Sequence, residues 1–259
     1  MASELHPPTI VNWLYERLLN SNILPDFFKG SAGEKLFQLV TFSWLIILGL
    51  LFISFIVSTR LRQLPGRLQM VAEIITEQLC GLLESLIGPG SRKYLGLLGT
   101  SFIFIFCLNV VGIIPGMISP TANWNCTVAL SLVTIIFVQA YAIKANGFGG
   151  YLKHLSGSPK GIAMWILVPF MFPIHLLGEA LKPLSLSLRL FANISGEDTI
   201  ILSIVGLIMH PPISWLPYPS FIGLILMMGF AIITSFLQAF IFTALSCIYI
   251  MLMTAHEEH

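Results

Sequence analysis

The segment Lys182-Pro-Leu-Ser-Leu-Ser-Leu-Arg189-Leu-Phe-Ala-Asn193 places two basic side chains inside an apolar tract that covers residues 162–209. That tract is longer than the roughly 20 residues a perpendicular membrane-spanning helix needs. An arginine at the centre of such a helix costs at least about 3 kcal/mol to insert, so it indicates a functional site. Arg189 is therefore the principal candidate. For Lys182 the alternative stays open that its side chain extends to the membrane interface.

The composition supports a membrane protein. Of 259 residues, 56% are hydrophobic and 10% are charged, against about 25% charged in a soluble domain. The mean hydropathy is +0.88 and the net charge is +1. These values exclude a basic nucleic-acid binder, a disordered chain and an ordinary cytosolic enzyme. The four cysteines stand singly, without CxxC spacing, and are interpreted as packing residues.

The chain is predicted to be an all-α integral membrane protein with five spanning helices. One further segment has Glu73, Glu77 and Glu84 opposite an apolar face, which predicts an amphipathic helix on the membrane surface. The predicted spans are about 36–58, 94–115, 127–144, 162–209 and 219–254, and the surface helix is about 66–88. Residues 1–35 are expected to form an external N-terminal segment, and residues 36–259 a single membrane domain. A glycine-rich and serine-rich loop is predicted from Gly147 to Pro159.

Basic residues predict the orientation. Eight of them lie in the loops between spans one and two and between spans three and four, whereas loops 116–126 and 210–219 hold none. The positive-inside rule therefore predicts an external N-terminus and a cytoplasmic C-terminus.

Polar residues in the fourth span form a stripe. At 100° per residue, Asn193 and Ser185 lie within about 40° of Arg189, and His175 lies on the same side. Three acids lie off this line, two about 80° away and the third on the opposite face of an ideal helix: Glu179, Glu197 and Asp198, in that order. In the last span Gln238 aligns with Thr234 and Tyr249. We interpret those two hydroxyl-bearing residues as interhelical contacts.

The segment 182–193 resembles the signature of subunit a of F-type ATP synthases. Segments 237–242, 109–115 and 120–127 strengthen the resemblance, which covers the chain from about Leu36 to its C-terminal end. The resemblance implies five spanning helices and a surface helix, with the last two spans forming a long tilted hairpin against the c-ring. In that family two offset half-channels lead protons to the c-ring, and an arginine that corresponds to Arg189 separates them.

The same resemblance implies partners and a location. A subunit of this kind contacts the c-subunit ring, the peripheral-stalk b subunits, other subunits of the complex and membrane lipid, and it binds no nucleic acid. It is not an enzyme as an isolated chain, and it needs no cofactor or metal. The expected location is the bacterial inner (plasma) membrane.

Individual residues match the family pattern unevenly. Gln238 matches the glutamine that meets the arginine, and Asn193 matches the asparagine one turn beyond it. The acid of the external channel falls on Asp198 by register, while Glu197 is better placed by helix face, so both are candidates. Some members carry a histidine partner for that acid, but this chain has Ala231 at the position.

The remaining candidates lie on both sides of Arg189. On the inner side, His175 and Glu179 stand one turn apart in the reverse of the family's order. Gly112 stands where some relatives have an acid, which leaves Asn109, Asn123 and Asn125 as weaker external candidates. For Asn123 the alternative of a helix cap stays open. The main alternative function is a secondary transporter with an intramembrane anion site, although no repeat relates the two halves of the chain.

Overall fold

The computed structural model describes residues 10–21, 25, 28, 30–59, 61, 66–114, 117–156, 168–209, 211 and 217–254. These residues form helices, turns and short connections, which confirms the all-α prediction. The helices are α1 (Ile10–Asn20), α2 (Ser31–Thr59), α3 (Arg67–Ile87), α4 (Leu95–Val111), α5 (Trp124–Leu155), α7 (Val168–Met209) and α8 (Pro217–Thr254), with 3-10 turns η3 (Ser91–Tyr94) and η4 (Pro120–Ala122).

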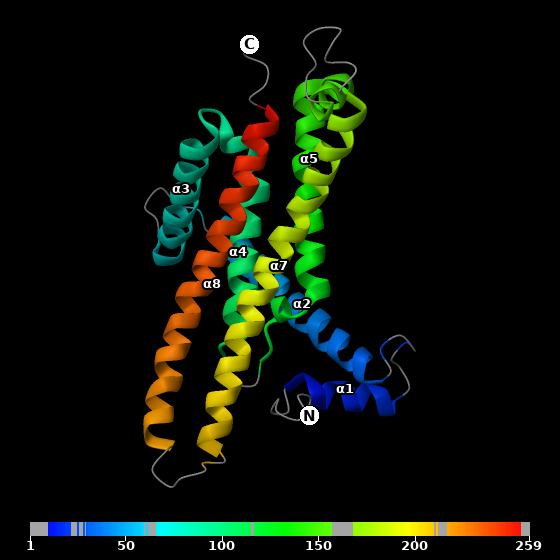
Figure 1. The fold of residues 1–259 in the computed structure, drawn as a ribbon. Coiled ribbons are helices and arrows are strands. Elements are labelled where there is room, and N and C mark those ends of the chain that lie inside the picture. Colours follow the sequence, from blue (N-terminus) through cyan, green and yellow to red (C-terminus); the bar gives the residue numbers. More distant parts are fainter. Residues whose placement is uncertain are drawn as a thin grey trace.

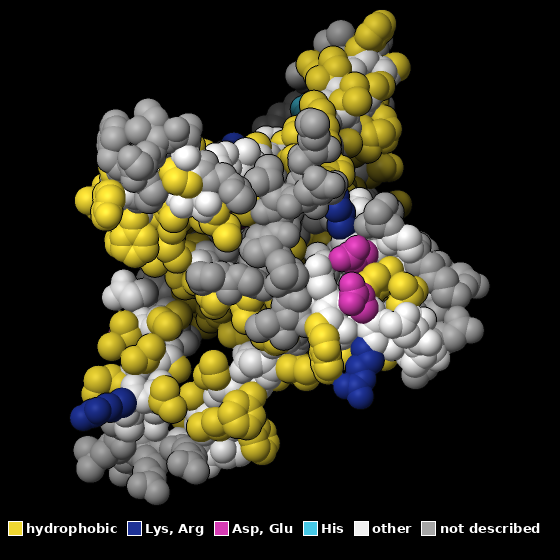
Figure 2. All heavy atoms as spheres, turned by 90° about the horizontal axis from the view of Figure 1, so that it is seen from below, with side chains coloured by type: hydrophobic (Ala, Val, Ile, Leu, Met, Phe, Trp, Pro, Cys, Tyr) yellow, Lys and Arg dark blue, Asp and Glu magenta, His cyan; other side chains and the backbone are white. Residues whose placement is uncertain are grey.

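Five segments of the described chain are long and apolar enough to cross a membrane, which confirms the predicted number. They are Gly33–Thr59, Ser91–Val111, Trp124–Leu152, Val168–Met209 and Tyr218–Met253. Large hydrophobic side chains such as Phe52, Phe170 and Leu226 are exposed on them. Figure 2, which views the molecule from below Figure 1, shows hydrophobic side chains over much of the described surface and few charged ones. A surface of this kind suits contact with lipid or with other apolar subunits.

The two longest helices, α7 and α8, run antiparallel and side by side (Figure 1). Helix α5 packs along α7, and α4 packs along α8. The end of α5, the beginning of α7 and the end of α8 lie at one end of the bundle, and the end of α7 and the beginning of α8 lie at the other (Figure 1). The long hairpin is thus present. Its placement against a c-ring stays a prediction.

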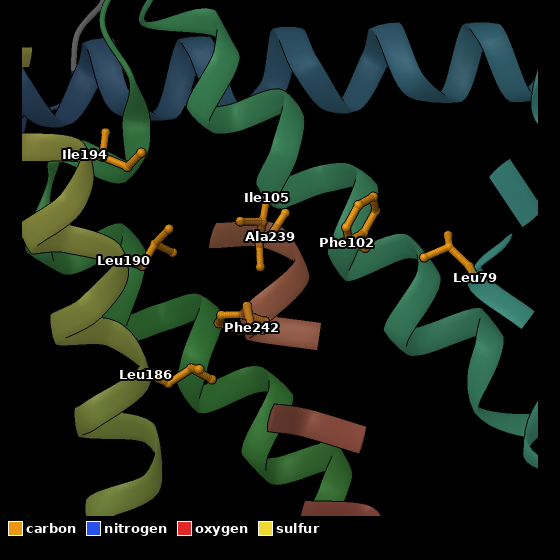
Figure 3. Close-up of a cluster of buried hydrophobic side chains, with 8 residues drawn as sticks. All are labelled: Leu79, Phe102, Ile105, Leu186, Leu190, Ile194, Ala239 and Phe242. Carbon is orange, nitrogen blue, oxygen red and sulfur yellow. The ribbon is translucent and has the colours of Figure 1, made fainter. Parts of the chain in front are cut away.

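The hydrophobic core fixes how α7 is rotated about its axis. Leu186, Leu190 and Ile194 point from α7 toward α4 and α8, where they meet Ile105 and Phe242 (Figure 3). These three residues follow a spacing of four, so they occupy one stripe of the helix. The stripe of α7 that carries Arg189 is centred about 100° around the helix from this apolar stripe, and Arg189 is exposed.

Helix α3 forms where the amphipathic segment was predicted. Leu79 and Leu83 in its second half are buried against the bundle, and α3 contacts both α4 and α8. Val71 and Ile74 in its first half are exposed. Only part of the predicted apolar face is therefore covered within this chain, and its contact with a membrane surface stays a prediction.

The prediction of a loop that begins at Gly147 is wrong for residues 147–155. Helix α5 continues to Leu155 and contains one non-helical residue, Gly147, with φ 69° and ψ 164°. A glycine adopts this conformation at little cost, so the chain bends there and resumes the helix. Leu155 is buried, which gives the second part of the helix a packing site. Residues 162–167, expected to begin the fourth span, lie outside the described residues.

Helix α1 was not predicted, because residues 1–35 were treated as one external segment. Its apolar residues Val11 and Tyr15 are buried, and the Tyr15 hydroxyl donates to the Phe28 carbonyl at 2.8 Å. Asn12 also contacts Gln38 of α2 through their side-chain amides. The helix therefore packs across the N-terminal part of α2 (Figure 1).

Candidate functional site

Helix α7 carries a row of exposed polar residues along one side. His175, Ser185, Arg189 and Asn193, which the helical periodicity placed on one side of the helix, are all exposed. The prolines inside the helix, Pro173 and Pro183, do not end it. Arg189 is consequently held by a continuous helix, about 100° around it from the centre of the buried stripe, and is exposed to a partner.

Next to Arg189, a hydrogen bond joins the two long helices. The Asn193 Nδ2 donates to the Gln238 Oε1 at 2.9 Å. Gln238 is 1% exposed, and its Nε2 has no hydrogen-bond partner within the described residues. The structure therefore pairs Gln238 with Asn193, one turn from Arg189.

A second polar cluster lies toward the N-terminal end of α7. Gln139 of α5 donates from Nε2 to the Glu179 Oε2 at 2.6 Å, and the Lys182 ammonium pairs with the Glu179 Oε1. The Lys182 Nζ also lies 4.8 Å from the centre of the Tyr249 ring of α8, which is within the range of a cation–π contact. The Lys182 ammonium is thus held between α7 and α8 and does not extend away from the bundle.

His175 lies one turn before Glu179 but outside this cluster. It is exposed, and its Nδ1 is 3.0 Å from the Met171 carbonyl oxygen of the same helix. The two inner candidates therefore differ in environment: Glu179 has both oxygens engaged, and the His175 ring is open to its surroundings.

A third cluster lies beyond Arg189 toward the C-terminal end of α7. Glu197 and Asp198 are adjacent there and both are partly buried. The Thr234 hydroxyl of α8 donates to the Phe230 and Ala231 carbonyls of its own helix, at 3.1 Å each. Ala231, one turn before Thr234, is buried and offers no polar group.

The connection between α4 and α5 brings Asn109 into a buried hydrogen-bond chain. The Thr121 hydroxyl donates to the Asn109 Oδ1 at 2.7 Å, and the Ser119 hydroxyl lies 2.7 Å from that of Thr121. A Cβ on Gly112 would come within 2.7 Å of the Ser119 Cβ. The connection therefore folds against Gly112 and occupies the space that a larger side chain would need there.

The other two asparagines have a local role. The Asn123 Oδ1 accepts a hydrogen bond from the Asn125 backbone N–H at 3.0 Å, at the beginning of α5. This is a helix-capping contact, the alternative that the sequence left open for Asn123. Neighbouring Ala122 ties the same turn to α7, because its carbonyl accepts from the Ser195 hydroxyl at 3.2 Å.

Sequence reasoning missed Gln139 altogether. It is the one amide side chain in the apolar segment 127–143, and that isolation was the available signal. Thr234 and Tyr249 were interpreted as interhelical contacts. Tyr249 does bridge α8 and α7, but its partner is the ionisable group of Lys182. The Thr234 hydroxyl instead donates to carbonyls of its own helix.

These features define a polytopic helical membrane protein with ionisable side chains clustered inside its longest helix. The model of the family described as ATP synthase A chain matches residues 40–251. The chain therefore belongs to the ATP synthase subunit a family, and ATP synthesis and proton transport at a membrane are the functions of that family.

Individual relatives agree with the family model. The chain is 37% identical to ATP synthase subunit a of Protochlamydia amoebophila over 200 residues, which cover 75% of this chain and 72% of the relative. It is 34% identical to ATP synthase subunit a 1 of Syntrophotalea carbinolica over 250 residues, with 95% and 96% covered. For ATP synthase subunit a of Oleidesulfovibrio alaskensis, the identity is 37% over 214 residues, with 83% and 84% covered.

Proposed function

We propose that this chain is the proton-translocating stator subunit of a rotary F-type ATP synthase, in which Arg189 separates two offset half-channels. The observation that carries the proposal is the exposed position of Arg189 on α7, with polar clusters before and after it on the same helix. Membership of the ATP synthase subunit a family supports it.

The mechanism follows from the cost of charge in a membrane. A rotor carboxylate must be neutral where it faces lipid and ionises only where water or an opposite charge compensates it. A guanidinium is always charged and cannot relay a proton itself. As the rotor acid approaches Arg189, it releases its proton to one half-channel, and Arg189 blocks direct passage to the other. Each charge moved through 100 mV supplies about 2.3 kcal/mol, so several protons drive one ATP.

The half-channel residues are assigned by their position relative to Arg189. The inner half-channel involves His175, Glu179 and Lys182. The external half-channel involves Glu197 and Asp198, with Asn193 and Gln238 beside Arg189. The asparagines of the α4–α5 region line its approach: Asn109, Asn123 and Asn125.

The proposed setting is a multi-pass position in the bacterial inner membrane, with the N-terminus outside and the C-terminus in the cytoplasm. Its partners are the c-ring, the peripheral-stalk b subunits and the other subunits of the complex. As an isolated chain it is not an enzyme. The support is the subunit family together with the basic residues in the two loops assigned to the cytoplasm.

The test is Arg189→Ala in the assembled complex, reconstituted in liposomes. We expect the variant to co-purify with a ring of small hairpin subunits at native yield, because Arg189 is not part of the core. Proton-driven ATP synthesis should be lost. Synthesis close to the native rate would overturn the proposal. Purification of the native chain alone, with binding of a small anion, would favour a secondary transporter instead.

A further inference from the structure

The two basic residues of α7 lie on the same side of the helix. Lys182 and Arg189 are seven residues apart, which places them within about 20° of each other around the helix and about 10 Å apart along it. From the backbone alone, both cations would face the same side. The structure separates them, because Arg189 is exposed whereas the Lys182 side chain is 19% exposed and paired with Glu179.

Three helices contribute to that separation. Glu179, 16% exposed, binds the Lys182 ammonium with Oε1 and accepts from Gln139 of α5 with Oε2. The Tyr249 ring of α8 covers the ammonium from another side. Both oxygens of the carboxylate are therefore bound by donors, and the Lys182 ammonium is held against Glu179 and Tyr249.

We propose that Glu179 is a positioning residue that holds and neutralises Lys182, so that Arg189 is the one uncompensated guanidinium or ammonium group on α7. The inference rests on the proposed function. Every residue of α7 is described, and Lys182 and Arg189 are its only lysine and arginine. A free ammonium two turns from Arg189 would form a second ion pair with the rotor carboxylate and delay it. Salt screens such pairs weakly away from water.

The proposal divides the inner half-channel between two roles. Glu179, with its oxygens bound by Lys182 and Gln139, does not carry the proton. The exposed imidazole of His175 is the group that remains open to exchange a proton on this side. A positioning role and a proton-carrying role of Glu179 predict different results when Lys182 is also replaced. A positioning residue becomes dispensable once the group it positions is removed, whereas a proton carrier stays necessary.

The experiment compares Glu179→Gln, Lys182→Met and the double variant in the purified complex, reconstituted in liposomes. Glu179→Gln should slow proton-driven ATP synthesis at least about tenfold, the factor that an added trap of about 1.4 kcal/mol produces. Lys182→Met should retain more activity than Glu179→Gln. The double variant should regain at least about fivefold over Glu179→Gln, because no ammonium is left to trap the rotor. A double variant as slow as Glu179→Gln would overturn the proposal and make Glu179 a proton carrier.

A matched control is the ion pair between Arg92 and Glu84, at 3.5 Å and with side chains 77% and 48% exposed. Glu84→Gln, Arg92→Met and their double variant should leave synthesis unchanged, since exposed pairs contribute little. If Glu179→Gln does not assemble, Glu179→Ala replaces it. That change also leaves the Lys182 ammonium without its carboxylate, and Lys182→Met must then restore its activity too; failure to do so would refute the inference.

Arg189→Ala, measured in the same vesicles, separates the two proposals. If Arg189→Ala is inactive but Lys182→Met does not rescue Glu179→Gln, the positioning role fails and the proposed function stands. If Arg189→Ala retains synthesis, the proposed function itself fails.

Discussion

The hydrogen bond between Asn193 and Gln238 predicts an asymmetric pair of mutants. Gln238 is buried and Asn193 is exposed, and the bond joins Nδ2 to Oε1 at 2.9 Å. Asn193→Ala leaves the Gln238 amide buried without its partner, which costs about 1–3 kcal/mol. Gln238→Leu removes the buried polar group and leaves Asn193 able to bind water at the surface. We expect this change to cost less than about 1 kcal/mol.

Two quantities are measured on the purified complex. The first is the unfolding of this subunit by heat or denaturant, and the second is the rate of proton-driven ATP synthesis. Asn193→Ala should be the less stable single variant. The double variant Asn193→Ala with Gln238→Leu should recover most of that stability, since the orphaned amide is gone. Synthesis should not recover in parallel, because the bond also fixes α7 against α8 one turn from Arg189, and small displacements of a reacting group are costly. Greater destabilisation by Gln238→Leu than by Asn193→Ala would refute this reasoning.

Three further predictions concern the charged residues of α7. Arg189→Lys should abolish proton-driven synthesis as measured in vesicles, because an ammonium can release its proton and lacks the fixed charge of a guanidinium; a native rate would contradict it. Glu197→Gln and Asp198→Asn should each reduce turnover partially, and the double variant should lose far more than the product of the two factors if the adjacent acids share one relay; strictly multiplicative losses would exclude sharing. In a background without cysteines, Cys at position 175 should react with an impermeant thiol reagent from the cytoplasmic side, and Cys at position 198 from outside; the reverse pattern would invert the proposed topology.

The predictions from the sequence were most accurate for features that depend on the residues of a single helix. The shared side of His175, Arg189 and Asn193 on one helix followed from a period of 3.6 residues, and all three residues are exposed in the structure. The number of spans followed from hydropathy and length. Neither result depends on how the helices meet, which is why both were accessible without coordinates.

Contacts between helices were beyond the same reasoning. Gln139 and Glu179 are 40 residues apart in sequence, and periodicity on one helix says nothing of the rotation of the next. The end of α5 was missed for another reason. Gly147 was interpreted as the start of a loop, but a single positive φ bends a helix without ending it when apolar residues beyond, such as Leu155, find a packing site.

Under the proposed function, the packing of α7 would keep the charge of Arg189 fixed beside the rotor. Leu186 and Leu190 are almost completely buried between α4 and α8, so rotating α7 to withdraw Arg189 would also expose two core leucines. Burying such a side chain contributes about 1.5–3 kcal/mol, so the rotation would cost several kcal/mol. The core thus holds Arg189 outward with a free energy comparable to that of two protons crossing 100 mV, at about 2.3 kcal/mol each. A stator that separates two proton paths needs this stiffness, because an arginine helix that turned more easily than the rotor would let the driving force dissipate without rotation.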